Sequence, residues 1–192
     1  MISLHNNLLN EINKDTFSGL TNLTHIYLYG NQLTYLDKEL FTGLVNLSEI
    51  HLNYNKLKRL HSQAFHGLKK LKEINLSGNE LEKIDKDTFH GLFSLTIIWL
   101  NNNQLNQIDK QTFSGLTNLT HIYMSNNQIS TDKLVLNIEK SVRFVSFKNE
   151  WNENNRESII KQVQKKFSAF LFLKKNNSII QFNFFHRTTG LL

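Results

Sequence analysis

A five-residue segment containing Phe-x-Gly-Leu recurs at one fixed interval through most of this chain. It reads TFSGL at 16–20 and returns as LFTGL at 40–44, AFHGL at 64–68, TFHGL at 88–92 and TFSGL at 112–116. A constant period of 24 residues, as from Phe17 to Phe41, indicates stacked, similar units, each of which packs only on its neighbours. The period therefore predicts a solenoid, in which each repeat makes one coil.

Each coil contains a short stretch in which apolar residues alternate with other residues. Alternation of this kind is typical of a strand with one buried face. Strands that recur once per period with no hairpin signal between them must run parallel, one per coil. The alternating pairs are Ile26/Leu28, Ile50/Leu52, Ile74/Leu76, Ile98/Leu100 and Ile122/Met124.

Two further residue series keep the same period and are interpreted as structural. An asparagine follows each strand, where its side-chain amide can satisfy backbone groups left free by the turn. A phenylalanine ends each coil and is expected to stack on its counterparts in a buried spine, rather than to form a cofactor site. The members are Asn31, Asn55, Asn79, Asn103 and Asn127, and Phe17, Phe41, Phe65, Phe89 and Phe113.

The coils share the pattern L-x-x-I/L-x-L-x-x-N-x-L, as in LTHIYLYGNQL at 23–33 and LKEINLSGNEL at 71–81. This pattern resembles the leucine-rich repeat family, in its 24-residue "typical" class, over residues 1–129. The resemblance implies an α/β fold: a right-handed, horseshoe-shaped solenoid with a short-stranded parallel sheet on its concave face and a mostly irregular convex side. It also implies a non-enzymatic protein-binding module, as in the receptor and adhesion ectodomains or secreted proteins of this class.

One internal match is closer than the repeat pattern requires. The segment Thr16–Tyr27, TFSGLTNLTHIY, is identical to Thr112–Tyr123, four coils further on. The pattern does not demand Thr21, Asn22 or His25, so the identity indicates that whole repeat units were copied.

The repeats, with partial first and last units, occupy residues 1–129, and the remainder divides into three segments. Residues 130–150 are predicted to form a degenerate last coil, because Val142, Val145 and Phe147 keep the apolar spacing. Residues 151–175 have apolar residues at helical spacing and are predicted to form an amphipathic helix that caps the last coil. The alternative is a basic helix that contacts a membrane surface. Residues 176–192 fit neither pattern and are expected to be irregular.

Charge and composition argue against several classes of function. The chain carries 22 Lys and Arg against 16 Asp and Glu, and the whole excess lies after residue 129. There is no cysteine and no spacing typical of a metal site, a phosphate loop or a catalytic constellation. Glu49 and Glu73 lie at outward strand positions where a nucleic-acid-binding face would need Lys or Arg. We therefore predict a protein that is not an enzyme, needs no cofactor or metal, and does not bind nucleic acid.

Large rings lie among the outward positions of the strands, which would line the concave face of a curved sheet. Rings of Tyr and Trp with little charge are typical anchors of protein interfaces. The alternative is ordinary scatter, because strands favour aromatic residues in any case. The sequence thus predicts a protein ligand on the concave face, bound by Tyr27, Tyr29, His51, Tyr54, Trp99 and Tyr123.

Three N-x-S/T sequons share the position just before the first leucine of a coil, at Asn22, Asn46 and Asn118. They are candidate glycosylation sites and fit the extracellular or cell-surface setting that the resemblance implies. Two alternatives stay open. No signal peptide is visible, and the absence of cysteine suits an intracellular scaffold or regulatory protein. The chain also lacks cysteine-rich caps, as a truncated gene product would. No apolar stretch is long enough to span a membrane.

Overall fold

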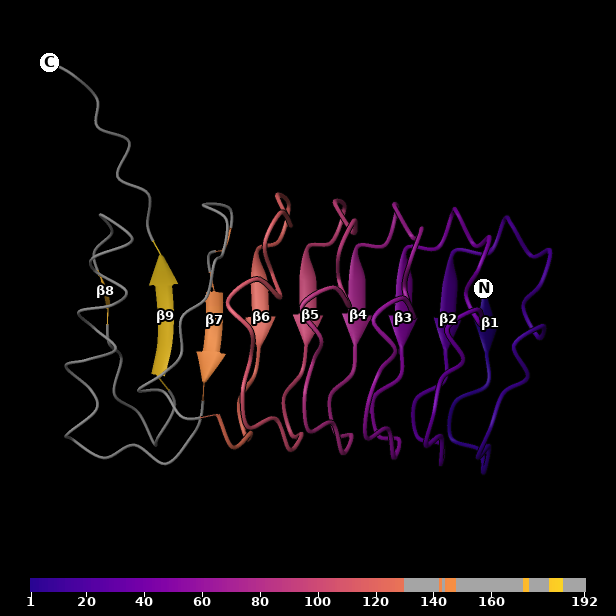
Figure 1. The fold of residues 1–192 in the computed structure, drawn as a ribbon, viewed down its shortest axis with the longest axis horizontal. Coiled ribbons are helices and arrows are strands. Elements are labelled where there is room, and N and C mark those ends of the chain that lie inside the picture. Colours follow the sequence, from indigo (N-terminus) through magenta and orange to yellow (C-terminus); the bar gives the residue numbers. More distant parts are fainter. Residues whose placement is uncertain (130–141, 143, 148–170, 173–179, 185–192) are drawn as a thin grey trace, which may run out of the picture.

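Nine short strands form a single sheet in the computed structural model, which describes residues 1–129, 142, 144–147, 171–172 and 180–184. The order in the sheet is β1-β2-β3-β4-β5-β6-β7-β9-β8 (Figure 1). Among the described residues there is no helix, and therefore none that could cross a membrane. The strands are β1 (Ile2–Ser3), β2 (His25–Tyr27), β3 (Glu49–His51), β4 (Glu73–Asn75), β5 (Ile97–Trp99), β6 (His121–Tyr123), β7 (Phe144–Phe147), β8 (Leu171–Phe172) and β9 (Ile180–Phe184).

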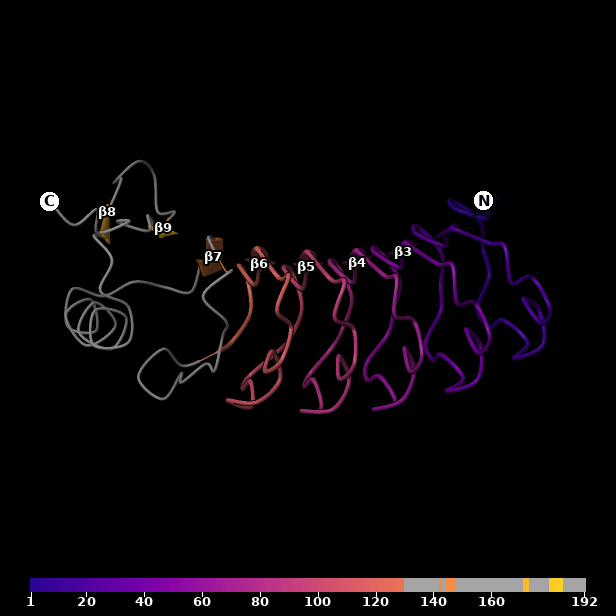
Figure 2. The same ribbon diagram turned by 90° about the horizontal axis from the view of Figure 1, so that it is seen from above.

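The first six strands pair in parallel, and each residue lies opposite its counterpart one repeat further on, as in Ile26 opposite Ile50 and Ile50 opposite Ile74. The middle residue of each strand from β2 to β6 is buried, and its two neighbours are half-buried. Figure 2 shows these strands along the inner side of a shallow curve, with the connecting segments on the outer side. The predicted parallel sheet, with one strand per coil, is confirmed.

The asparagine series forms a buried ladder between coils, which explains why each coil carries one. The Asn79 amide nitrogen donates to the carbonyl oxygens of Leu76 in its own coil and of Leu52 in the coil before, each at 3.0 Å. Its carbonyl oxygen accepts from the Leu57 amide at 3.1 Å. One side chain thus satisfies backbone groups of two coils that the sheet leaves free.

The phenylalanine series packs on the outer side of each coil as the predicted spine. Neighbouring rings are stacked, with centroids 6.0–6.4 Å apart, and each ring is at most 1% exposed. The glycine two residues later adopts a left-handed backbone, as at Gly67 with φ of +83°, a conformation that side chains with a Cβ rarely adopt.

The last three strands lie beyond residue 129. Strand β7, in the segment expected to form a degenerate last coil, pairs in parallel with β6 and places Val145 opposite Ile122. However, Leu171–Phe172 form strand β8 where the helix over 151–175 was predicted, and Ile180–Phe184 form strand β9 within the expected irregular tail. Strand β9 runs antiparallel to both β7 and β8, so ladder hydrogen bonds compete with helix formation at residues 171–172. The rest of the predicted helix and tail lies outside the described residues.

Candidate functional site: the concave face of the sheet

Strands β2 to β6 expose two columns of side chains on the concave face, because the first and third residue of each strand point away from the core. Register keeps each column in line across the sheet. Neither column contains Lys or Arg. The first column is His25, Glu49, Glu73, Ile97 and His121, and the second is Tyr27, His51, Asn75, Trp99 and Tyr123.

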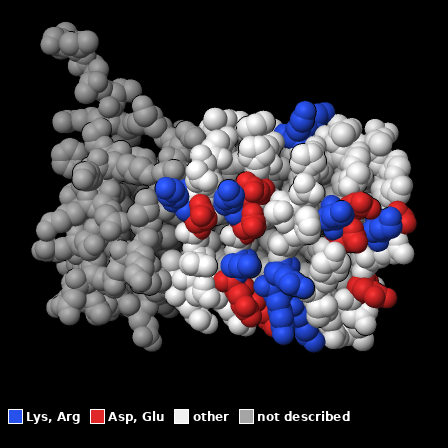
Figure 3. Space-filling model, in the orientation of Figure 1, with Lys and Arg blue, Asp and Glu red and all other residues white. Residues whose placement is uncertain are grey.

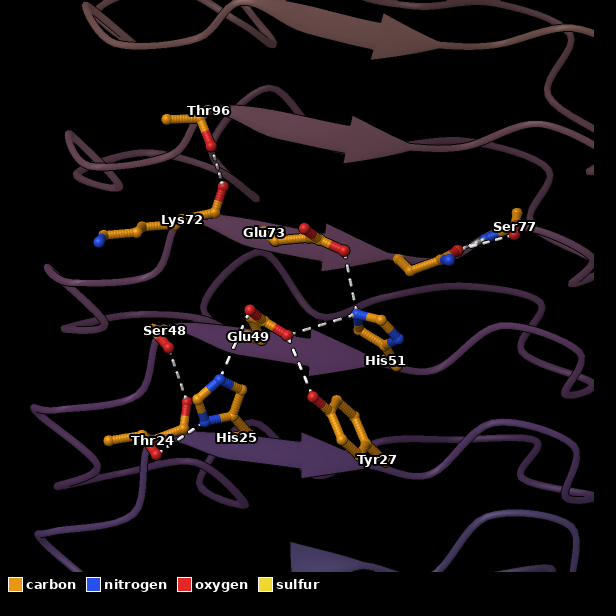
Figure 4. A network of polar contacts seen from close by, with 11 residues as sticks. Thr24, His25, Tyr27, Ser48, Glu49, His51, Lys72, Glu73, Ser77 and Thr96 are labelled. Atoms are coloured by element: carbon orange, nitrogen blue, oxygen red, sulfur yellow. Dashed lines mark hydrogen bonds and ion pairs between the residues drawn. The ribbon is translucent and has the colours of Figure 1, made fainter. Parts of the chain in front are cut away.

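Five of these residues form a polar network on β2, β3 and β4 (Figure 4), which we call the imidazole–carboxylate cluster: His25, Tyr27, Glu49, His51 and Glu73. The Tyr27 hydroxyl donates to Glu49 Oε2 at 3.2 Å. His51 Nε2 donates to Glu73 Oε1 at 3.0 Å and lies 3.9 Å from Glu49 Oε2. His25 Nε2 lies 3.5 Å from Glu49 Oε1. Both carboxylates are therefore held in place by neutral or titratable groups.

Burial shifts the acid–base behaviour of two members of the cluster. Partial burial raises the pKa of the Glu73 carboxyl, and the neighbouring Glu49 charge raises it further, while His51 opposes both effects. Burial also raises the pKa of the Tyr27 hydroxyl, with a further contribution from the charge and hydrogen bond of Glu49. The cluster thus concentrates negative charge on a partly desolvated surface.

The other half of the face is aromatic. The rings of Trp99 on β5 and Tyr123 on β6 are stacked, with centroids 5.5 Å apart and planes 7° apart. We call this pair the aromatic platform. His121 stacks on Tyr123 with centroids 6.2 Å apart, and Ile97 lies beside His121 in the neighbouring column. The platform offers a flat, half-buried apolar surface next to the cluster.

Two of the six predicted ligand-binding residues lie beyond the strands. Tyr29 stacks on His5 with centroids 4.5 Å apart. Tyr54 is 63% exposed and has a left-handed backbone, with φ of +55°, which is strained for a bulky residue. Its equivalents in neighbouring coils are Gly30 and Gly78. The structure therefore places Tyr27 in contact with His51, and Trp99 in contact with Tyr123. Tyr29 and Tyr54 lie after the ends of strands β2 and β3.

Three members of the cluster were not among the predicted ligand-binding residues: His25, Glu49 and Glu73. The signal that identifies them is the register itself, since residues one repeat apart lie directly opposite each other. Glu49 faces Glu73 across the β3–β4 pair, and His25 faces Glu49 across the β2–β3 pair. This arrangement cannot be inferred from the individual residue types, but it can be inferred from which residues the register places opposite each other on neighbouring strands.

The candidate glycosylation sites lie just before the strands and differ in their surroundings. Asn22 is exposed. The Asn46 amide nitrogen donates to the Thr21 carbonyl at 2.9 Å, and that of Asn118 donates to the Phe93 carbonyl at 2.7 Å. Asn22 is therefore the least constrained acceptor of the three.

Charges elsewhere are mixed in sign. The face seen in Figure 3 carries Lys and Arg interspersed with Asp and Glu. Lys14 and Glu39 form an exposed ion pair at 3.4 Å. Within the described part of the chain, no three His, Asp or Glu side chains are placed to hold a metal ion.

Fold and face together define a parallel-strand solenoid with a patterned concave surface. The leucine rich repeat profile matches residues 1–33, 30–81 and 70–129, and the chain belongs to the leucine-rich repeat family. A comparison with curated proteins gives no match.

Solved structures of this family are similar over about two thirds of the chain. The leucine-rich repeat domain of APL1B is 28% identical, with a TM-score of 0.61 over 66% of this chain and 38% of that one. A chain of the LRIM1/APL1C complex is 30% identical, with a TM-score of 0.62 over 67% of this chain and 23% of that one. A chain of the glycosylated Toll–Spatzle complex of Drosophila is also 30% identical, with a TM-score of 0.62 over 64% of this chain and 16% of that one. This chain thus spans well under half the length of each.

Proposed function

We propose that this chain is a non-enzymatic binding module that recognises a protein ligand on its concave face. The observation that carries the proposal is the aromatic platform, because a flat pair of half-exposed rings in a row of outward positions is suited to anchoring a partner side chain. The similar LRIM1/APL1C and Toll–Spatzle structures are complexes with other proteins, which supports the same class of function here.

The proposal is tested by selecting binders from a displayed library of protein fragments of the source organism. Clones enriched on the full chain are measured again on a Trp99→Ala/Tyr123→Ala variant. The matched control is Phe93→Ala, which removes a 54% exposed ring from a connecting segment. We expect at least a tenfold loss of affinity for the platform variant and no change for the control, since truncation of an aromatic anchor typically costs about 2 kcal/mol or more.

Circular dichroism and urea unfolding establish that both variants are folded before binding is compared. Clones that bind the platform variant as tightly as the unmodified chain, or that depend on Phe93 instead, would refute recognition on the concave face.

We further propose an extracellular or cell-surface setting, as in secreted leucine-rich repeat proteins. The exposed Asn22 sequon and the glycosylated form of the similar Toll–Spatzle structure support it. Endoglycosidase treatment of the endogenous protein is expected to lower its mass, and an Asn22→Gln variant is expected to lack at least one glycan. An unmodified mass together with a cytosolic distribution would favour an intracellular scaffold instead.

A further inference from the structure

Within the described residues, no permanent cation neutralises the two carboxylates of the imidazole–carboxylate cluster. Glu49 and Glu73 are direct partners across the β3–β4 pair, and neighbouring strands lie about 4.8 Å apart. Like charges directly opposite each other destabilise a sheet. In the part of the chain that the structure describes, the groups that contact them are the Tyr27 hydroxyl and the two imidazoles, and no outward position of β2–β6 carries Lys or Arg.

The carboxylates are both oriented and accessible. Their side chains keep 32% and 25% of their surface exposed, so oxygen atoms can be reached from the concave side. The hydrogen bonds from Tyr27 and His51 fix their positions before any ligand arrives. A bound cation would therefore gain charge-assisted hydrogen bonds at little cost in side-chain ordering.

The aromatic platform lies on the next two strands, at a defined separation. Glu73 on β4 is one strand from Trp99 on β5, and the pair Glu49/Glu73 is centred two strands from the pair Trp99/Tyr123. At the usual strand spacing the two pairs are about 10 Å apart across the strands, and the two-residue offset between the columns adds about 7 Å along them, so the separation is about 12 Å. Acidic groups at this distance from a flat apolar surface form a two-part pattern that a single partner segment can match.

We propose that the concave face binds a protein segment that presents a Lys or Arg side chain to Glu49 and Glu73. About 12 Å away, the same segment places an apolar or aromatic side chain on the platform formed by Trp99 and Tyr123. This inference rests on the proposed function and specifies the chemistry of its ligand. Charge complementarity selects a cationic segment over an acidic or neutral one.

The probe is a displayed library of random 12-residue peptides, panned on the full chain. Enriched peptides are expected to contain more Lys or Arg than the starting library, together with an aromatic or branched apolar residue. A Glu49→Gln/Glu73→Gln variant keeps the side-chain size but removes both charges, and we expect it to bind these peptides roughly 10- to 100-fold more weakly. The Trp99→Ala/Tyr123→Ala variant is expected to weaken the same peptides.

The matched control is Glu11→Gln/Glu82→Gln, which makes the same change of net charge at two exposed positions outside the two columns. It is expected to leave binding unchanged within about twofold, because salt screens the charges of exposed residues outside the cluster.

The outcomes separate this inference from the proposed function. Peptides that need Trp99 and Tyr123 but carry no excess of Lys or Arg, or that are indifferent to Glu49→Gln/Glu73→Gln, overturn the cationic segment and leave concave-face binding standing. If the Glu11→Gln/Glu82→Gln control loses as much peptide affinity as Glu49→Gln/Glu73→Gln, the loss is explained by net charge alone, and the inference is also overturned. Peptides unaffected by every concave-face substitution overturn both proposals.

Discussion

Replacing Asn79 with alanine is expected to destabilise the fold strongly, although the change removes only a small polar side chain. Asn79 is 6% exposed and makes three hydrogen bonds of 3.0–3.1 Å with Leu52, Leu57 and Leu76. The Leu52 and Leu76 carbonyls keep a second donor, from Asn55 and Asn103 respectively. The Leu57 amide has only the Asn79 oxygen, so the substitution leaves it buried without an acceptor.

The magnitude follows from these bonds. A buried donor left without a partner costs about 1–3 kcal/mol, and each of the two further bonds contributes about 0.5–1.5 kcal/mol. We therefore expect Asn79→Ala to lower the free energy of unfolding by roughly 2–6 kcal/mol. Asn79→Asp retains an acceptor for Leu57 but places a carboxylate against two carbonyl oxygens, and it is expected to destabilise the protein at least as much at neutral pH.

Urea unfolding, followed by far-ultraviolet circular dichroism and by tryptophan fluorescence, measures these changes. Coincident transitions would justify a two-state free energy. The exposed Asn106 serves as the control, with Asn106→Ala expected to stay within about 0.5 kcal/mol of the unmodified chain. A loss below about 1 kcal/mol for Asn79→Ala would contradict the reasoning, since it would mean that the freed Leu57 amide finds another partner.

Three more predictions use other features of the described residues. Thr88→Val is expected to stabilise the protein by about 0.5–2 kcal/mol, because the buried Thr88 hydroxyl has no hydrogen-bond partner; a loss of stability in urea would contradict this. Gly78→Ala is expected to destabilise by more than the roughly 1–2 kcal/mol typical of a left-handed alanine, because its Cβ would lie 2.6 Å from Tyr54 Cδ1. The excess should vanish in a Tyr54→Asn background, and an unchanged cost there would refute the contact. Finally, the raised pKa of Glu73 means that the folded state takes up its proton before the unfolded state does. As the pH rises through and above the ordinary glutamate pKa of about 4.3, stability relative to Glu73→Gln should therefore fall, and a rise would contradict the assigned direction.

The repeating part of the fold could be predicted from the sequence because its determinants lie within a single coil. Ile50 is buried at the centre of strand β3 and Leu52 directly after that strand, Asn55 is buried in the turn that follows, and Phe65 is buried at the end of the coil. Each position recurs five times with the same chemistry, so one correct assignment fixes all the others. Strand β9 was missed although IQFNF alternates apolar and polar residues, because its partner β7 lies far earlier in the chain, beyond the whole of the predicted helix.

The candidate site was predicted only in part because it depends on contacts between coils. Aromatic residues at outward positions identified Tyr27, Trp99 and Tyr123, but residue type alone could not show that Trp99 and Tyr123 stack as one surface. The positions of Tyr29 and Tyr54 beyond the strands follow from how the chain turns after each strand. At Tyr54 the turn requires a left-handed backbone, which its residue type does not suggest.

The duplicated segment shows how the same sequence acquires different surroundings in a solenoid. Thr16 is exposed, whereas its copy Thr112 is buried. Tyr27 donates a hydrogen bond to Glu49, whereas its copy Tyr123 stacks on Trp99. Copying a repeat therefore preserves the core, because core contacts are the same in every coil. It changes the side-chain contacts on the concave face, because those contacts depend on the residues of the adjacent coils. Under the proposed function, recognition would depend on pairs of adjacent coils, and a change in their order would alter the ligand without altering the fold.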